Sequence, residues 1–154
     1  MKPALALLAL LLLAAPARAA EGTLESAEAL VMAQYGPEAD SSPDAAVRLY
    51  APEIGQEMMD PIRGAGAVNL GIDPRYGQDN WSVTGAVTAA ASALPDGKAR
   101  VVARFLNFGK PTEIDWTLAP ALDTPSGWRV WDISAPDQND WAAFDMRQML
   151  NLKP

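Results

Sequence analysis

The spacing of apolar residues is helical in the first third of the chain and changes to a period of two after it. A helix is predicted over residues 24–35, where apolar positions recur every three or four residues until a Gly-Pro pair ends the run. Ser42 followed by proline is a typical helix start, so a second helix is expected. Pro52 then redirects the chain into a short third helix that ends near Met59.

Residues 60–80 lack this period and are rich in Gly, Pro, Asp and Asn, which predicts a long loop. Loops of this length are uncommon unless they have a function. Polar side chains in the loop could line the mouth of a pocket or hold a hard cation such as calcium, but their spacing is not that of an EF-hand. Asp and Asn also fold loops into turns, which is the interpretation we favour over a metal site. The candidate ligand- or partner-binding residues are Asp73, Arg75, Tyr76, Gln78 and Asp79.

Four antiparallel strands are predicted after residue 80, because apolar and polar positions alternate there and turn sequences separate the runs. The first begins at Trp81, the second spans about residues 98–108, the third follows a turn at Gly109-Lys110, and the fourth spans residues 128–133. Alternation assigns the inner face of the sheet to Trp81, Ala99, Val101, Ala103, Phe105, Trp116 and Trp128.

The turn at Gly109-Lys110 predicts how the second and third strands pair. A two-residue loop sets residues whose numbers sum to 219 opposite one another, so that Arg104 faces Asp115. Pro111 cannot donate the hydrogen bond that closes such a turn, so a four-residue loop with a sum of 221 is the alternative. Arg100 joins Arg104 on the outer face, which predicts a solvated ladder of mixed charge and a poor buried interface.

The end of the chain predicts one more helix, over residues 140–150, with Asn139 as its cap. Helices followed by a meander of strands are typical of an α+β fold. We therefore expect N-terminal helices packed on one face of a bent, four-stranded antiparallel sheet, with a C-terminal helix.

The first 19 residues have the composition of a cleavable export signal. Lys2 precedes an apolar run over residues 4–15, and Ala17-Arg18-Ala19 is a small-x-small cleavage site. The apolar run is shorter than the ~20 residues that a membrane-spanning helix needs. We therefore expect residues 1–19 to be a signal peptide, residues 20–154 to form a single domain, and the protein to be periplasmic or secreted, with no membrane anchor after cleavage.

The composition excludes several classes of chemistry. Neither His nor Cys occurs, which rules out a Ser-His-Asp triad, a Cys nucleophile, a disulfide and an imidazole metal site. Any catalysis must use carboxylates, Tyr, Lys or Ser, and we predict no metal and no cofactor. Removal of Lys2 and Arg18 with the signal takes the net charge from −7 to −9, which repels nucleic acid.

Three segments occur in a recognisable order: residues 49–52 (Leu-Tyr-Ala-Pro), then Asp73-Pro74 with Gln78-Asp79, then residues 127–133 (Gly-Trp-Arg-Val-Trp-Asp-Ile). Their combination resembles a bacterial family of exported domains of unknown function. The resemblance covers roughly residues 24–150 and implies a fold similar to nuclear transport factor 2 and the cystatins. In that cone-shaped fold a bent sheet wraps around helices and often leaves a pocket at its wide end. The resemblance implies no activity, because this scaffold carries enzymes, ligand binders and interaction modules.

Asp132 is the candidate for a catalytic group. If the fourth strand alternates strictly, Asp132 points to the same face as Trp116 and Trp128, where desolvation would raise the pKa of its carboxyl toward that of a general acid or base. A carboxylate near a strand end more often binds backbone amides of a neighbouring loop or helix, and we favour that interpretation. Trp131 alternates outward and is the candidate for an exposed contact with a partner.

Two hypotheses of function follow. The leading one is a non-catalytic module that binds a small molecule or a periplasmic protein at the cone mouth and the loop over residues 60–80. The alternative is a carboxylate-dependent lyase, isomerase or hydrolase in the cone pocket, with Asp132 as base and Tyr50 or Tyr76 as its polar partner. The enzyme needs an ionisable group close to a second polar group inside a pocket, whereas the module needs only shape and an apolar lining.

Overall fold

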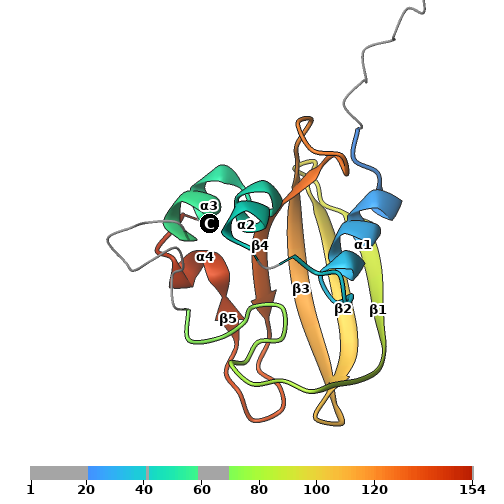
Figure 1. Ribbon diagram of the computed structural model, residues 1–154, viewed down its shortest axis with the longest axis vertical. Helices are drawn as coiled ribbons and strands as arrows, with labels where there is room; N and C mark the ends of the chain where they lie inside the picture. Colours follow the sequence, from blue (N-terminus) through green and yellow to red (C-terminus); the bar gives the residue numbers. More distant parts are fainter. Residues whose placement is uncertain (1–20, 41, 59–69, 154) are drawn as a thin grey trace, which may run out of the picture.

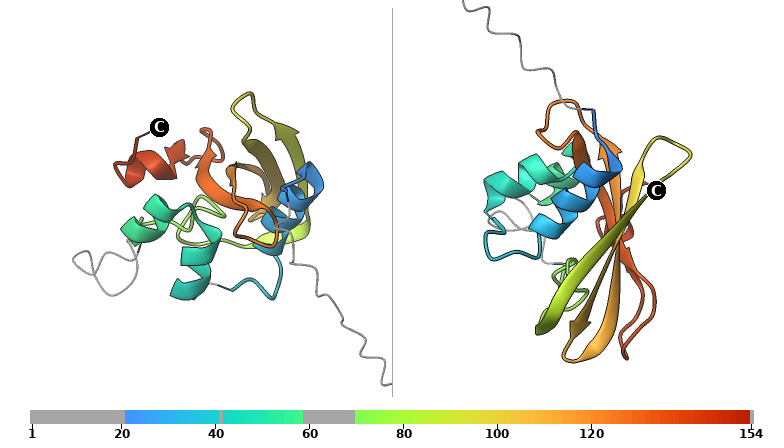
Figure 2. Two further views of the ribbon diagram at one scale, coloured as in Figure 1. Left: turned by 90° about the horizontal axis from the view of Figure 1, so that it is seen from above. Right: turned by 90° about the vertical axis from the view of Figure 1, so that its right-hand side faces the viewer.

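A computed structural model describes residues 21–40, 42–58 and 70–153 (Figure 1). The predicted export signal at residues 1–19 and most of the first half of the predicted loop, residues 60–69, lie outside the described residues. The described part is an α+β fold in which helices cover one face of an antiparallel sheet, here called the inner face (Figure 2, right). No helix in this part is long and apolar enough to cross a membrane.

The three N-terminal helices begin where their sequence signals predict. Helix α1 (Leu24–Ala33) has Thr23 as its cap, in a capping box with Ser26. Helix α2 (Pro43–Leu49) is capped by Ser42, whose hydroxyl oxygen accepts the N–H of Ala45 at 3.2 Å. Helix α3 (Pro52–Met58) starts at the proline that was expected to redirect the chain. These predictions are confirmed.

The sheet has five strands, one more than predicted, in the order β1-β2-β3-β4-β5, and every neighbouring pair is antiparallel. The additional strand, β5, pairs with the end of β4. The strands are β1 (Val83–Ala93), β2 (Ala99–Asn107), β3 (Lys110–Pro120), β4 (Trp128–Ala135) and β5 (Phe144–Asp145).

The predicted helix over residues 140–150 is wrong over most of its length. Asn139 and Asp140 have φ angles of 53° and 68°, a left-handed conformation that cannot start a right-handed helix. The chain then pairs with β4 as β5 and becomes helical only in α4 (Met146–Met149). The cap of α4 is Asp145, whose carboxylate accepts the N–H of Gln148 at 2.8 Å.

Both predicted registers of β2 and β3 are wrong, because the turn lies one residue earlier. Asn107 pairs with Lys110 and Arg104 with Glu113, which corresponds to a sum of 217. Phe108 and Gly109 form the loop, with φ angles of 51° and 76°, as a two-residue hairpin turn requires. The shift lets Lys110 close the turn in place of Pro111, which has no N–H to donate.

The outer face of the sheet still carries the predicted ladder of mixed charge. Arg104 pairs with Glu113 at 2.8 Å, and Arg100 pairs with Asp115 at 2.7 Å. Alternation along β2 and β3 is therefore confirmed, although the partners differ by one step from the predicted ones.

A bulge in β4 overturns the predicted orientation of Asp132. Val130 lies opposite Leu118, but Asp132 lies opposite Thr117, so Trp131 is an extra residue without a partner on β3. After this extra residue, the side chains of β4 that alternation assigns to one face lie on the other, as they would after a register shift of one residue. Asp132 therefore lies with Thr117 on the outer face, and Ile133 takes the buried inner position.

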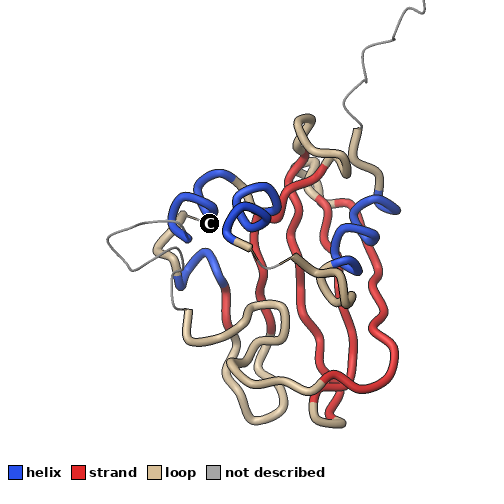
Figure 3. Tube along the Cα trace, viewed as in Figure 1, coloured by secondary structure: helices blue, strands red, loops and turns tan. Residues whose placement is uncertain are grey.

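The core is formed by α1, α3, α4 and the inner face of the sheet. The predicted core positions of β2 are all buried, as are Trp116 and Trp128. Trp81 does not belong to this core: it precedes β1, is 41% exposed, and stacks on Tyr76 with ring centroids 4.5 Å apart. The predicted inward position of Trp81 is therefore wrong. Figure 3 shows that the loop after residue 70 and the β3–β4 turn lie at opposite ends of the sheet.

Candidate functional site

The loop residues predicted to bind a ligand mostly bind one another. Asp73 accepts hydrogen bonds from the side chain of Arg75 at 2.6 and 3.0 Å and from its backbone N–H at 3.0 Å. These bonds raise the pKa of the Arg75 guanidinium. Gln78 forms a β-bridge with Asp73, and Asp79 is exposed. The acidic residues of the described segments gather nowhere into a group of three or more that could hold a metal ion.

Tyr76 of this loop closes one end of the inner face. Its buried ring stands edge-on to Tyr35 at 5.7 Å and to Phe105 at 6.0 Å. The Tyr35 hydroxyl accepts the indole N–H of Trp116 at 3.1 Å and donates to the backbone carbonyl of Arg75 at 2.9 Å. Burial raises the pKa of Tyr35. Large aromatic side chains therefore fill this end of the inner face, which we call the closed end.

Trp131 and Asp132 lie together on the outer face, beside α4. The Trp131 ring is covered by the guanidinium of Arg147 at 3.7 Å and by the ammonium of Lys98 at 4.7 Å. Asp132 accepts the backbone N–H of Arg147 at 3.1 Å. Burial, and then the charge of Asp145, raise the pKa of Asp132. Both side chains thus have the contacts of groups that hold α4 against β4.

The structure does not bring Asp132 together with the tyrosines that were considered as its catalytic partners. Tyr50 and Tyr76 belong to the buried core on the inner face, and burial raises the pKa of Tyr50 to about 12. Asp132 lies on the other face because of the bulge. An acid–base pair of Asp132 with either tyrosine therefore lacks the contact that general acid–base catalysis requires.

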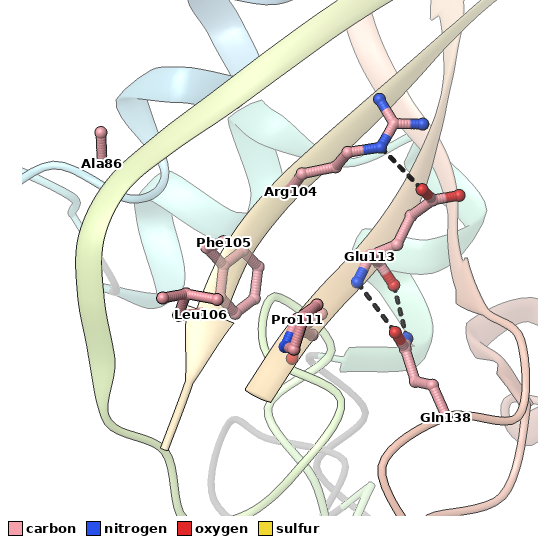
Figure 4. A pocket seen from close by; sticks show the side chains of 8 residues that line it. Ala86, Arg104, Phe105, Leu106, Pro111, Glu113 and Gln138 are labelled. Carbon is pink, nitrogen blue, oxygen red and sulfur yellow. Dashed lines mark hydrogen bonds and ion pairs between the residues drawn. The ribbon is translucent and has the colours of Figure 1, made fainter. Parts of the chain in front are cut away.

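A groove that we call the outer-face groove opens where β1 bows away from β2 (Figure 4), apart from a smaller cavity of about 320 Å³ that Trp131 and Asp132 line. The outer-face groove has a volume of about 540 Å³. The charged and amide side chains that line it already have partners: Arg104 binds Glu113 at 2.8 Å, and the amide of Gln138 binds the backbone N–H and C=O of Glu113 at 2.9 and 2.6 Å. These groups therefore have little capacity left for a polar ligand.

A second groove lies on the helical side, between α1, α2 and the β3–β4 turn, and we call it the helix-side groove. Its volume is about 440 Å³, within the range of small-molecule pockets. Its lining combines apolar side chains with charged ones at the rim. The principal lining residues are Leu30, Ala33, Ala45, Leu49 and Trp128, with Glu38, Asp40, Arg48, Asp123 and Arg129.

Trp128 is fixed in this groove by α1. Its indole N–H donates to the backbone carbonyl of Thr23 at 3.0 Å and to the hydroxyl of Ser26 at 3.1 Å. Gly22 passes so close to the ring that a Cβ atom at this position would overlap it. The N-terminal end of α1 thus holds Trp128 in one orientation.

The two arginines of the groove differ in the hydrogen bonds and ion pairs that they form. Arg129 donates to the carbonyls of Val47 and Tyr50 at 3.2 and 3.3 Å and pairs with Asp123 at 2.9 Å. Arg48 has neither a hydrogen bond nor an ion pair within the segments that the structure describes, and it affects Asp40 only through its charge. Arg48 is therefore the cation of this groove that is available to a ligand.

The helix-side groove was not predicted from the sequence. Its residues come from three separate segments, and only the packing of α2 against β4 brings them together. Arg48 belongs to no motif, and Trp128 was assigned to the core alone.

Comparison with known proteins adds no relative: the chain matches no protein-family model, no curated protein and no solved structure. The resemblance to exported domains with the fold of nuclear transport factor 2 therefore stays a prediction, while the α+β fold with a five-stranded antiparallel sheet rests on the structure itself.

Proposed function

We propose that this protein is a non-catalytic binding domain that holds a small molecule in the helix-side groove. The observation that supports this most strongly is that an apolar floor and the guanidinium of Arg48, which has no hydrogen bond or ion pair among the described residues, meet in one cavity of small-molecule size. The closed end is filled by aromatic side chains, and the polar groups of the outer-face groove are already bound. The proposal takes the place of the site expected from the sequence, at the cone mouth and the loop over residues 60–80.

The proposal includes the wider setting that the sequence predicts. The expected signal at residues 1–19 favours a periplasmic or secreted binding protein, and the expected fold similar to nuclear transport factor 2 is compatible with a pocket between helices and sheet. The catalytic alternative has less support, because its carboxylate lies on the face opposite to both tyrosines.

Binding of a neutral fluorescent probe, N-phenyl-1-naphthylamine, tests the proposal. Ala45→Trp would fill the helix-side groove, and Ala86→Trp adds the same side chain to the outer-face groove as a matched control. We expect wild type and Ala86→Trp to bind the probe equally, and Ala45→Trp to lose binding while its melting curve shows that it is folded. Loss of binding in Ala86→Trp alone, or no binding by the wild type, would contradict the proposal.

A further inference from the structure

We propose that the ligand of the helix-side groove is an amphipathic carboxylate, with its apolar body on the groove floor and its carboxylate bound by Arg48. This inference rests on the proposed function and adds the chemical class of the ligand. It follows from the position of Arg48, from the charges around it, and from the size of the apolar floor.

The position of Arg48 is set by contacts at both ends of α2. Ser42 caps its first turn, and directly after the helix the N–H of Ala51 donates to the carbonyl of Val130 at 2.8 Å. Tyr50 forms a β-bridge with the same residue. Arg48, in the last turn of α2, is therefore held at a constant place beside β4 and lines the groove. Its planar fork of N–H groups matches a carboxylate bidentately.

Two of the three carboxylates at the rim already have partners, whereas Glu38 has none among the described residues. Asp123 is paired with Arg129, and Asp40 accepts the backbone N–H of Ser42 at 2.8 Å. That hydrogen bond is the main reason why the pKa of Asp40 is lowered. Glu38 is the remaining carboxylate and is exposed at the rim. A guanidinium is more weakly hydrated than an ammonium and tolerates cover by a ligand. Because Arg48 has no hydrogen bond or ion pair in the described part of the chain, it favours an anionic ligand.

The floor accepts an apolar body of moderate length. Leu30, Leu49 and Trp128 line it together with alanines from both helices. A volume of about 440 Å³ has room for on the order of ten to fifteen non-hydrogen atoms at about 30 Å³ each. Decanoate, a straight-chain carboxylate, has this size and is the probe of choice.

The experiment compares decanoate, 1-decanol and decylammonium, at concentrations below those of micelle formation, by isothermal titration calorimetry. Wild type is compared with Arg48→Gln, with Arg48→Lys, and with Arg104→Gln as a matched control in the outer-face groove. Arg48 has no partner to lose in the described structure, so Arg48→Gln should melt like the wild type. We expect decanoate to bind about five- to tenfold more tightly than decanol, and Arg48→Gln to abolish this preference without weakening decanol.

Arg48→Lys should retain part of the preference, because it keeps the charge and loses the fork. Arg104→Gln should behave like the wild type. Equal binding of decanoate and decanol by the wild type would overturn the inference and leave the proposed function intact. Tighter binding of decylammonium, or a decanoate preference that survives in Arg48→Gln, would also overturn it. If none of the three compounds binds while N-phenyl-1-naphthylamine does, the inference fails and the proposed function stands. If the wild type binds neither, both fail.

Discussion

The two ends of the inner face are built from different side chains and have different consequences. At the closed end, Tyr35, Tyr76, Phe105 and Trp116 fill the space above the sheet, and the loop after residue 70 supplies one of these rings. At the other end, alanines and two leucines of α1 and α2 line a groove together with Trp128. Small side chains at the second end therefore leave a cavity, whereas aromatic side chains fill the first end. A binding site is expected where the packing is incomplete, not where an irregular loop is longest.

The largest expected effect on stability comes from removing an aromatic side chain of the closed end. Trp116→Ala removes a fully buried ring and its hydrogen bond to Tyr35, and we expect a loss of about 3–5 kcal/mol in the free energy of unfolding. Leu30→Ala, at the half-buried wall of the groove, should cost less than half as much. Urea denaturation of both variants measures the difference. Equal losses would mean that the two ends are packed alike.

A smaller effect is expected where the loop meets the C-terminal segment. Gly77 has a φ of 72°, and a Cβ atom there would overlap the ring of Trp141. Gly97→Ala is the matched control, because Gly97 has a φ of 80° with no atom near its Cβ position. We expect Gly97→Ala to cost about 1 kcal/mol from strain alone and Gly77→Ala about 1–3 kcal/mol more. Thermal melting of the two variants measures the difference. An equal loss of stability in both would show that Trp141 does not pack tightly against Gly77.

Alkaline pH should destabilise the fold through its buried tyrosines, among them Tyr35 of the closed end. Burial raises the pKa of Tyr35 above its ordinary value of 10.0, so the folded protein keeps a proton that the unfolded chain has lost. The free energy of unfolding should therefore fall as the pH rises above about 10, and Tyr50, with its pKa raised to about 12, adds to the slope. Tyr35→Phe should flatten the slope above about pH 10, whereas Arg48→Gln in the helix-side groove should leave it unchanged. A slope that Tyr35→Phe does not reduce would contradict the assignment of this pH dependence to Tyr35.

The smallest effect is expected on the outer face. Arg104→Ala breaks an ion pair whose side chains are 54% and 35% exposed, and it should cost about 0.2–1 kcal/mol. Added salt should reduce this difference further, because exposed charges are screened. Urea denaturation at low and high salt measures it. A loss comparable to that of Trp116→Ala would show that the outer face is covered by a partner rather than by solvent.

Local signals in the sequence predicted the three N-terminal helices and the inner faces of β2 and β3. A capping serine and alternating apolar residues act within a few positions, and Ser42, Val101 and Trp116 lie where these signals place them. The errors arise where one residue changes the geometry. The left-handed Phe108 moved the β2–β3 turn, and the bulge at Trp131 turned Asp132 to the other face. Neither feature has a sequence signature that alternation alone can detect.

The candidate site could not be predicted for a different reason. Leu30, Arg48 and Trp128 are far apart in the chain, and each has an ordinary role by itself, as an apolar helix residue, a charged helix residue and a core aromatic. Only the seating of α2 against β4 makes them neighbours. The polar residues of the loop, in contrast, were conspicuous in the sequence, but Asp73 and Arg75 use their charges on each other.

The five tryptophans offer the most direct test of the central claim, that the helix-side groove holds the ligand. Each indole N–H gives its own signal in a ¹H–¹⁵N correlation spectrum, and single Trp→Phe variants assign them. Titration with decanoate should shift the signal of Trp128, which lines the groove, and leave those of Trp116 at the closed end and Trp131 on the outer face unchanged. Shifts of Trp116 or Trp131 with Trp128 unmoved, or no shift at saturating decanoate, would contradict it.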